Sequence, residues 1–223
     1  MTANRIRVNR FAAALQRGLN KLLEPLSKSR VTQFEILPAV EADLVMLGDS
    51  ITEQGVWNEW FPGKIVLNRG ISGNTTTQVL ARMHAAGLTP KTRAVFLLIG
   101  TNDLTQGYPQ ETIVANVTEI LRQIKQLAPE AKVVLQSVMP RKVSYAEAVM
   151  QLNLAYREVA ETLKLEYLDL WPALADDDRG IIQELSFDKL HLNGRGYRVW
   201  FEVLQPVVKA IWDADGDRAQ PGS

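Results

Sequence analysis

Short apolar runs alternate with longer amphipathic segments from about residue 43 to residue 211 of this 223-residue chain. The runs are apolar on successive residues, so both faces of the strands that they predict should be covered. Strands and helices in alternation predict right-handed crossovers and a parallel sheet sandwiched between helices. The apolar runs fall at 44–47, 65–67, 94–99, 133–135 and 167–168, and the helical stripes at 113–127, 149–163 and 197–211.

The composition excludes several classes of protein. The absence of Cys excludes a disulfide scaffold, a thiolate zinc site and a Cys nucleophile, and two distant His residues cannot assemble a typical zinc site. We therefore predict no metal. No dinucleotide motif or P-loop lysine follows the first strand, so we predict no cofactor. With 25 basic and 25 acidic residues, nothing in the overall charge favours nucleic-acid binding.

We expect a soluble, cytoplasmic protein. No apolar run approaches the ~18–20 residues that cross a bilayer. Residues 1–30 also lack the continuous apolar region of a secretory signal.

The neutral total charge hides two unlike parts. Residues 1–31 carry seven basic side chains against one acidic, whereas the remainder carries 18 basic and 24 acidic. Apolar residues at helical spacing predict a basic amphipathic helix that Pro25 ends or kinks. We thus predict an N-terminal arm (1–31), a globular domain (32–212) and a flexible polar tail (213–223). The apolar stripe of the arm consists of Phe11, Leu15, Leu19, Leu22 and Leu26.

Three interpretations of this arm stay open, and packing of its apolar stripe against the domain is favoured. It could instead contact an anionic membrane surface peripherally or mediate self-association, for example as a homodimer. In composition it also resembles an organellar transit peptide, because it is rich in Arg and poor in acids.

Small and polar residues cluster directly after the predicted strands, where parallel sheets bind their ligands. Each motif alone has a plain structural explanation: Ser50 could cap a helix, and Asn102 could close a turn. Together they supply a nucleophile, a His with an Asp three residues before it, and two donor loops, which are the parts of an acyl-transfer site. The motifs are Gly48-Asp49-Ser50-Ile51-Thr52, Asn68-Arg69-Gly70-Ile71-Ser72-Gly73-Asn74, Gly100-Thr101-Asn102-Asp103 and Asp188-Lys189-Leu190-His191-Leu192-Asn193.

These four blocks resemble the GDSL or SGNH hydrolase family, in order and spacing, from Gly48 to Tyr197. The resemblance is greatest to bacterial esterases related to the catalytic subunits of intracellular platelet-activating-factor acetylhydrolase. Ile51 stands where the GDSL motif has Leu, which is a conservative change. We expect a three-layer α/β/α sandwich of flavodoxin type, with a five-stranded parallel sheet in the order 2-1-3-4-5.

The resemblance implies a role for each residue. Ser50 would be the nucleophile, His191 its general base and Asp188 the group that orients the imidazole. The oxyanion hole would consist of the backbone N–H groups of Ser50 and Gly73 and the side-chain amide of Asn102.

Other residues near these motifs allow two interpretations. Trp57 and Trp60 could wall the substrate cleft, or they could pack the first helix against the domain. His84 is interpreted as a solvated or packing residue, and Asp176-Asp177-Asp178 as an acidic loop at the rim. Asp49 is expected to hold its turn by hydrogen bonding.

We therefore predict a serine hydrolase that cleaves small-molecule esters with short acyl groups through an acyl-enzyme intermediate. The chain has no insertion long enough for a lid, so the cleft should be shallow and open. Acyl or acetyl transfer and carbohydrate deacetylation at the same site are the alternatives. A non-catalytic lipid- or glycan-binding module is the third hypothesis.

Overall fold

The computed structural model describes the backbone of residues 10–216 and the side chains of residues 18 and 24–213. Five parallel strands form one sheet in the order β2-β1-β3-β4-β5, which confirms the predicted sheet and its strand order. The strands are β1 (Leu44–Gly48), β2 (Val66–Gly70), β3 (Ala94–Leu98), β4 (Lys132–Gln136) and β5 (Glu166–Leu168).

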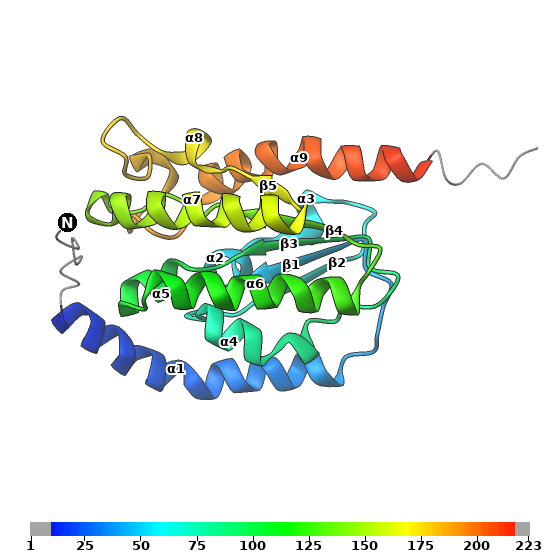
Figure 1. Cartoon of the computed structure of the whole chain (residues 1–223), viewed down its shortest axis with the longest axis horizontal. Coiled ribbons are helices and arrows are strands. Elements are labelled where there is room, and N and C mark those ends of the chain that lie inside the picture. The colour runs from blue at the N-terminus through cyan, green and yellow to red at the C-terminus, as the bar shows by residue number, and fades with distance from the viewer. Residues whose placement is uncertain (1–9, 217–223) are drawn as a thin grey trace, which may run out of the picture.

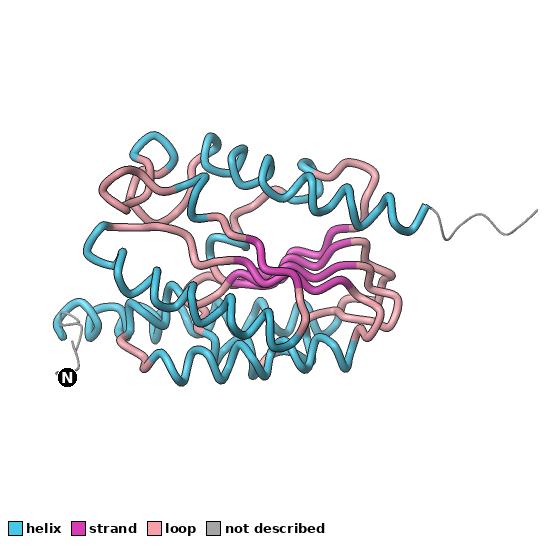
Figure 2. The backbone as a smooth tube through the Cα atoms, turned by 45° about the horizontal axis from the view of Figure 1, so that its top comes forward, coloured by secondary structure: helices cyan, strands magenta, loops and turns pink. Residues whose placement is uncertain are grey.

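The central strands are buried on both faces, as their unbroken apolar runs predict. Along β1, Val45 and Leu47 join one core, and Leu44 and Met46 join the other. The first core also takes side chains from α4, α6 and α7, and the second takes them from α2, α3, α8 and α9. Figure 2 shows the sheet between these two helical layers.

The four long helices in the described part of the chain lie where the sequence predicts them, and short ones occupy the loops. Their bounds are α1 (Arg10–Ile36), α2 (Ser50–Glu53), α3 (Trp57–Trp60), α4 (Thr76–Ala81), η1 (Met83–Ala85), α5 (Thr101–Gln106), α6 (Gln110–Leu127), η2 (Val143–Tyr145), α7 (Ala146–Leu163), α8 (Trp171–Leu174), η3 (Gln183–Leu185) and α9 (Gly194–Gly216).

Helix α1 lies outside α4 and contacts α5 and η1, as an additional layer on one side of the molecule (Figure 1). Pro25 does not end this helix, which continues to Ile36, so that part of the prediction is wrong. A proline removes one backbone donor but has a helical φ, so a helix can continue past it with a bend. The axis of α1 changes direction along its length in Figure 1.

The C-terminal part of α1 packs against the body. Phe34 is buried against Ile71 and Ala85, with Val31 beside them. Of the predicted apolar stripe, Leu26 is 67% exposed, and the side chains of its other four residues lie outside the described part. Residues 1–9 of the arm and 217–223 of the tail are also outside it, and α9 extends to Gly216. Among the described residues, no helix is both long enough and apolar enough to cross a membrane.

Candidate active site

Ser50 lies at the end of β1, as the first residue of the short helix α2. Asp49 caps this helix, because its carboxylate accepts a hydrogen bond of 3.0 Å from the backbone N–H of Ile51. Gly48 is required for close packing: a Cβ there would lie 2.3 Å from the carbonyl oxygen of Leu98. Ser50 therefore lies at the edge of the sheet, directly after the strand. Asp49 holds the turn there by a hydrogen bond, as the sequence predicts for Asp49.

Ser50 and His191 are in contact although 141 residues separate them. The hydroxyl Oγ of Ser50 lies 2.9 Å from Nε2 of His191, and Nδ1 of the same ring lies 2.7 Å from Oδ2 of Asp188. The structure thus brings together the three residues that the last and first motifs supply. Their order along one hydrogen-bonded line is hydroxyl, imidazole, carboxylate.

Asp188 is held as a carboxylate. Burial alone would raise its pKa, but hydrogen bonds from the His191 ring and from the backbone N–H groups of His191 and Leu190 lower the pKa of Asp188 to about 2. Lys189 has a φ of 61°, a left-handed conformation that residues with a side chain rarely adopt. This tight turn returns His191 to Asp188.

A backbone bridge and a helix cap hold the loop that carries His191 in place. Ser186 and Leu192 form an isolated antiparallel bridge across it. Asn193 then caps α9, since its side-chain oxygen accepts from the backbone N–H groups of Arg195 and Gly196 at 2.9 and 3.2 Å. The rigid start of α9 therefore sets where His191 lies.

Gly73 and Asn102 lie in the two loops that follow β2 and β3. Gly73 has a φ of 76°, which favours glycine. Asn102, near the start of α5, is almost fully buried, and its amide Nδ2 donates a hydrogen bond of 3.0 Å to the carbonyl oxygen of Asn74. This bond fixes the amide of Asn102 beside the residue that follows Gly73. The two loops are thus joined directly.

A buried arginine, which sequence reasoning missed, holds the same region. The Arg82 guanidinium donates to the Asn74 side-chain oxygen at 2.7 Å and to the carbonyl oxygens of Gly48 and Arg69 at 2.9 and 3.0 Å. Burial and the nearby charge of Arg69 lower the pKa of Arg82 to about 10. In the sequence it is only a basic residue, and in the structure it directly follows the last residue of α4.

Two buried carboxyl groups lie next to the proposed nucleophile and amide. Burial raises the pKa of Asp49 to about 7 and, with part of the effect offset by hydrogen bonds from Thr76, that of Asp103 to about 6. Asp103 accepts from the Thr76 backbone N–H at 3.0 Å and from its hydroxyl at 2.6 Å. Asp103 therefore connects α5 to the start of α4 rather than closing a turn.

The structure does not bring Trp57 and Trp60 together with Ser50 and His191. Trp57 is 2% exposed and packs edge-on against Trp200 with ring centroids 4.7 Å apart. Trp60 stacks on Phe201 at 4.9 Å. Both contacts are with α9, so these side chains correspond to the packing alternative, and a side chain as buried as Trp57 offers a substrate almost no surface.

His84 and the three consecutive aspartates are exposed, as expected. His84 Nε2 lies 2.8 Å from the Glu35 carboxylate of α1, an ion-pair partner distant in sequence. Asp176 accepts from the Gly180 backbone N–H at 2.8 Å within its own loop. Within the described part of the chain, no three His, Cys, Asp or Glu side chains gather as a metal site would require.

Comparison with known proteins gives concordant matches. A family model, described as the GDSL-like Lipase/Acylhydrolase family, matches residues 46–199. The alpha2 subunit of platelet-activating factor acetylhydrolase IB from Rattus norvegicus is 28% identical over 189 residues, which cover 81% of this chain and 82% of the relative. The human alpha1 subunit is 25% identical over 190 residues, 81% of each chain.

A solved structure from Streptococcus pneumoniae is similar over 88% of this chain and 99% of its own, with a TM-score of 0.80 and 26% identity. A GDSL-like lipase from Bacteroides thetaiotaomicron has a TM-score of 0.71 at 22% identity, over 82% of this chain and 97% of its own, and shows the fold alone.

Proposed function

Because the chain belongs to the GDSL-like Lipase/Acylhydrolase family and is a carboxylic ester hydrolase, we propose that it cleaves short-chain esters through an acyl-enzyme intermediate on Ser50. The observation that carries this proposal is the 2.9 Å contact between Ser50 Oγ and His191 Nε2. A serine hydroxyl is a weak nucleophile until a base takes its proton.

The carboxylate of Asp188 sets the tautomer of the imidazole. An ionised carboxylate can only accept hydrogen bonds, so Nδ1 of His191 carries the proton that it shares with Asp188 at 2.7 Å. Nε2 then has a free lone pair directed at the Ser50 hydroxyl. His191 takes the serine proton as Oγ attacks the acyl carbon, and Asp188 stabilises the imidazolium that forms.

The negative charge of the tetrahedral intermediate needs donors that are already in place. The backbone N–H groups of Ser50 and Gly73 and the amide of Asn102 are proposed for this role. Asn102 has its amide orientation fixed by Asn74 before a substrate arrives, so little reorganisation is needed during the reaction. When the intermediate collapses, His191 returns its proton to the departing alcohol oxygen.

Water then attacks the acyl group on Ser50, with His191 again as the base, and the carboxylic acid is released. The His191 and Asp188 side chains are 32% and 53% exposed. Such an accessible base favours hydrolysis over transfer to another alcohol, because transfer requires that water be kept out. The exposure of these two side chains is that of a shallow site, which also favours short acyl groups.

Covalent labelling tests this proposal directly. A fluorophosphonate should modify Ser50 and no other serine, as located by mass spectrometry, and the Ser50→Ala variant should neither be labelled nor release p-nitrophenol from p-nitrophenyl acetate. Undiminished turnover by folded Ser50→Ala protein would refute Ser50 as the nucleophile. Absence of labelling and turnover in the folded wild-type protein would favour a non-catalytic binding module.

A further inference from the structure

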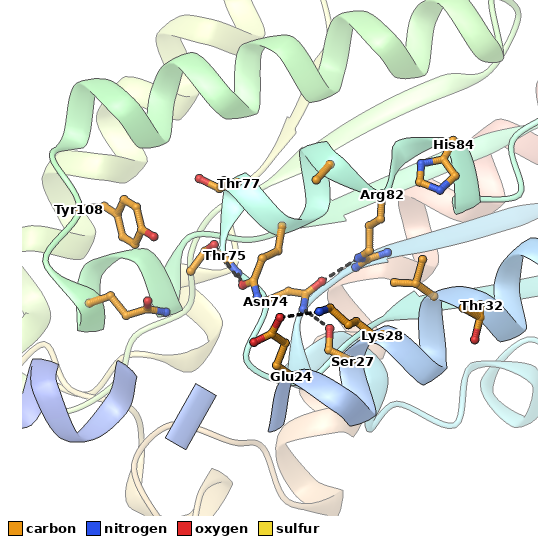
Figure 3. Close-up of a pocket in the computed structure, with 14 residues that line it drawn as sticks. Glu24, Ser27, Lys28, Thr32, Asn74, Thr75, Thr77, Arg82, His84 and Tyr108 are labelled. Atoms are coloured by element: carbon orange, nitrogen blue, oxygen red, sulfur yellow. Dashed lines mark hydrogen bonds and ion pairs between the residues drawn. The ribbon is translucent and has the colours of Figure 1, made fainter. Parts of the chain in front are cut away.

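A cavity of about 730 Å³ lies between α1 and the loop that carries Asn74, and it is not lined by Ser50, His191 or Asp188 (Figure 3). Pockets of roughly 300–1,000 Å³ enclose most of a small ligand. One wall is α1, which precedes the residues that the family model matches. The opposite wall consists of α4 and the segments just before and after it, and the end of α5 closes one side. This cavity is therefore built partly by a segment outside the matched region.

The charged groups around the cavity already have partners in the protein. Lys28 pairs with Glu24 at 2.7 Å, and His84 pairs with Glu35 at 2.8 Å. Arg82 is buried and bonded to Asn74, as Figure 3 shows. Nη1 of Arg82 is screened from solvent and has no hydrogen-bond partner among the described residues, but the other nitrogens of this guanidinium bond to uncharged oxygens. An uncharged ligand therefore suits the cavity.

Uncharged hydrogen-bonding side chains make up most of the remaining wall. Hydroxyls both donate and accept, and amides carry one group of each kind, which matches the hydroxyl groups of a sugar. The amide Nε2 of Gln106 is screened from solvent and has no hydrogen-bond partner among the described residues, so a ligand oxygen would satisfy it. The side chains in question belong to Ser27, Thr32, Thr77, Gln78, Gln106 and Tyr108.

Tyr108 adds an aromatic surface to this wall. Its side chain is 37% exposed, and it follows the C-terminal cap of α5. A tyrosine ring offers an apolar face together with a hydroxyl. A pyranose ring has the complementary pair of properties, because its C–H bonds give an apolar face and its hydroxyls surround the edge.

The cavity adjoins the loop that contains Gly73, because Asn74 and Thr75 of this loop line it. The Asn74 side chain lines the cavity and donates to Ser27 Oγ of α1 at 3.3 Å, while the backbone carbonyl of Asn74 holds the amide of Asn102. Thr75, which also lines it, is two residues after Gly73. A group bound in the cavity therefore lies against the same loop that would bind the reacting carbonyl.

We propose that this cavity binds the alcohol portion of the ester, and that this portion is an uncharged saccharide. The inference rests on the proposed function. If the acyl group is short, the larger part of the substrate is its alcohol, and a cavity of this size next to the oxyanion loop accommodates that part. Helix α1 is then a wall of the substrate site as well as a packing layer.

Filling the cavity tests this assignment. Ala81 is an exposed residue of the cavity wall at the end of α4, so Ala81→Phe places a ring in the cavity with little risk to folding. We expect kcat/KM for 6-O-acetylcellobiose, divided by that for p-nitrophenyl acetate, to fall at least about tenfold. The matched control is Ala39→Phe, which adds the same ring at an exposed alanine outside the cavity and should leave the ratio as in the wild type.

Two results would overturn the saccharide assignment while leaving the esterase proposal intact. One is an unchanged ratio in Ala81→Phe. The other is a selective loss of activity toward octyl acetate or p-nitrophenyl octanoate, with acetylcellobiose unaffected, because the cavity would then hold an alkyl chain.

Binding of cellobiose to the Ser50→Ala protein, followed by NMR titration, separates this inference from the catalytic one. Cavity residues such as Gln78 and Gln106 should shift, and Gln106→Leu in the same background should weaken binding roughly three- to tenfold, as loss of one hydrogen bond does. Absence of binding would refute the saccharide site even if the enzyme hydrolyses p-nitrophenyl acetate. Binding in a protein without esterase activity would refute only the proposed function.

Discussion

The hydroxyl of Tyr197 donates a hydrogen bond of 2.7 Å to the backbone carbonyl of Ile51, the residue after Ser50. Tyr197 belongs to α9, the helix that begins directly after the His191 loop, and Ile51 belongs to α2. This buried bond joins the two segments that carry Ser50 and His191. It therefore connects the first and last motifs through the scaffold, in addition to the contact between Ser50 and His191.

The first prediction concerns this bond. Tyr197→Phe leaves the Ile51 carbonyl buried without its donor, so the free energy of unfolding in urea should fall by about 1–3 kcal/mol. The rate constant kcat should fall as well, because the distance between Ser50 and His191 is less strictly held. Tyr167→Phe is the matched control: its hydroxyl donates to the Asn153 carbonyl at 3.2 Å on the edge strand β5, so kcat should not change. Equal kcat in both variants would contradict a positioning role for Tyr197.

The second prediction concerns the imidazole. In Asp188→Asn the amide no longer dictates which ring nitrogen carries the proton, so kcat should fall by roughly 10²–10⁴. His191→Ala should be about as damaging as Ser50→Ala, because the residues act as a unit. Single-turnover measurements with p-nitrophenyl acetate would check both. Near-normal acylation by folded His191→Ala would mean that another group deprotonates Ser50.

The sheet was predictable because burial on both faces leaves a direct mark on a strand. Val45 and Leu47 must be apolar for one core, and Leu44 and Met46 for the other. The four residues therefore form an unbroken apolar run that is easy to recognise as a buried strand. The continuation of α1 past Pro25 was not predictable in this way. The part of α1 after Pro25 is stabilised by the packing of Phe34. The partners of Phe34, Ile71 and Ala85, are distant in sequence.

The residues of the candidate site were predictable as motifs, but their support was not. Ser50 and His191 follow predicted elements in recognisable blocks, whereas Arg82 looks like any basic residue near the end of a helix. Its role depends on carbonyls of Gly48 and Arg69 that only the folded sheet edge presents to it. The sequence likewise does not distinguish a tryptophan that lines a cleft from one that is buried in the core. Trp57 is buried because it packs on Trp200, which is distant in sequence.

The third prediction concerns the amide of Asn102. Asn102→Ala removes one proposed donor to the developing negative charge, so kcat for p-nitrophenyl acetate should fall about 10²–10³-fold with a much smaller change in KM. Asn116→Ala is a suitable control. Its amide donates to the Thr76 and Thr77 hydroxyls at 3.0 and 3.1 Å, so its loss should reduce thermal stability without that fall in kcat. An equal fall in kcat for both variants would indicate general loosening of the loop.

The last prediction concerns the pH dependence of stability at Asp49. Burial raises the pKa of this carboxyl from 3.8 to about 7, so the folded protein retains a proton that the unfolded chain has already lost between these values. The contribution of Asp49 to the free energy of unfolding is therefore largest below pH 3.8. Above that pH it falls by up to about 1.4 kcal/mol per pH unit, and the fall ends at about pH 7.

Asp49→Asn removes this titration while it keeps the oxygen that accepts from Ile51. Urea unfolding of the variant between pH 4.5 and 7.5 should show a shallower decline than the wild type, with the largest gain in relative stability at the alkaline end. Parallel curves for the two proteins would mean that Asp49 is ionised in the folded state throughout this range. Its buried carboxylate would then depend on the hydrogen bond from Ile51 and on the charge of Arg141, both of which lower its pKa.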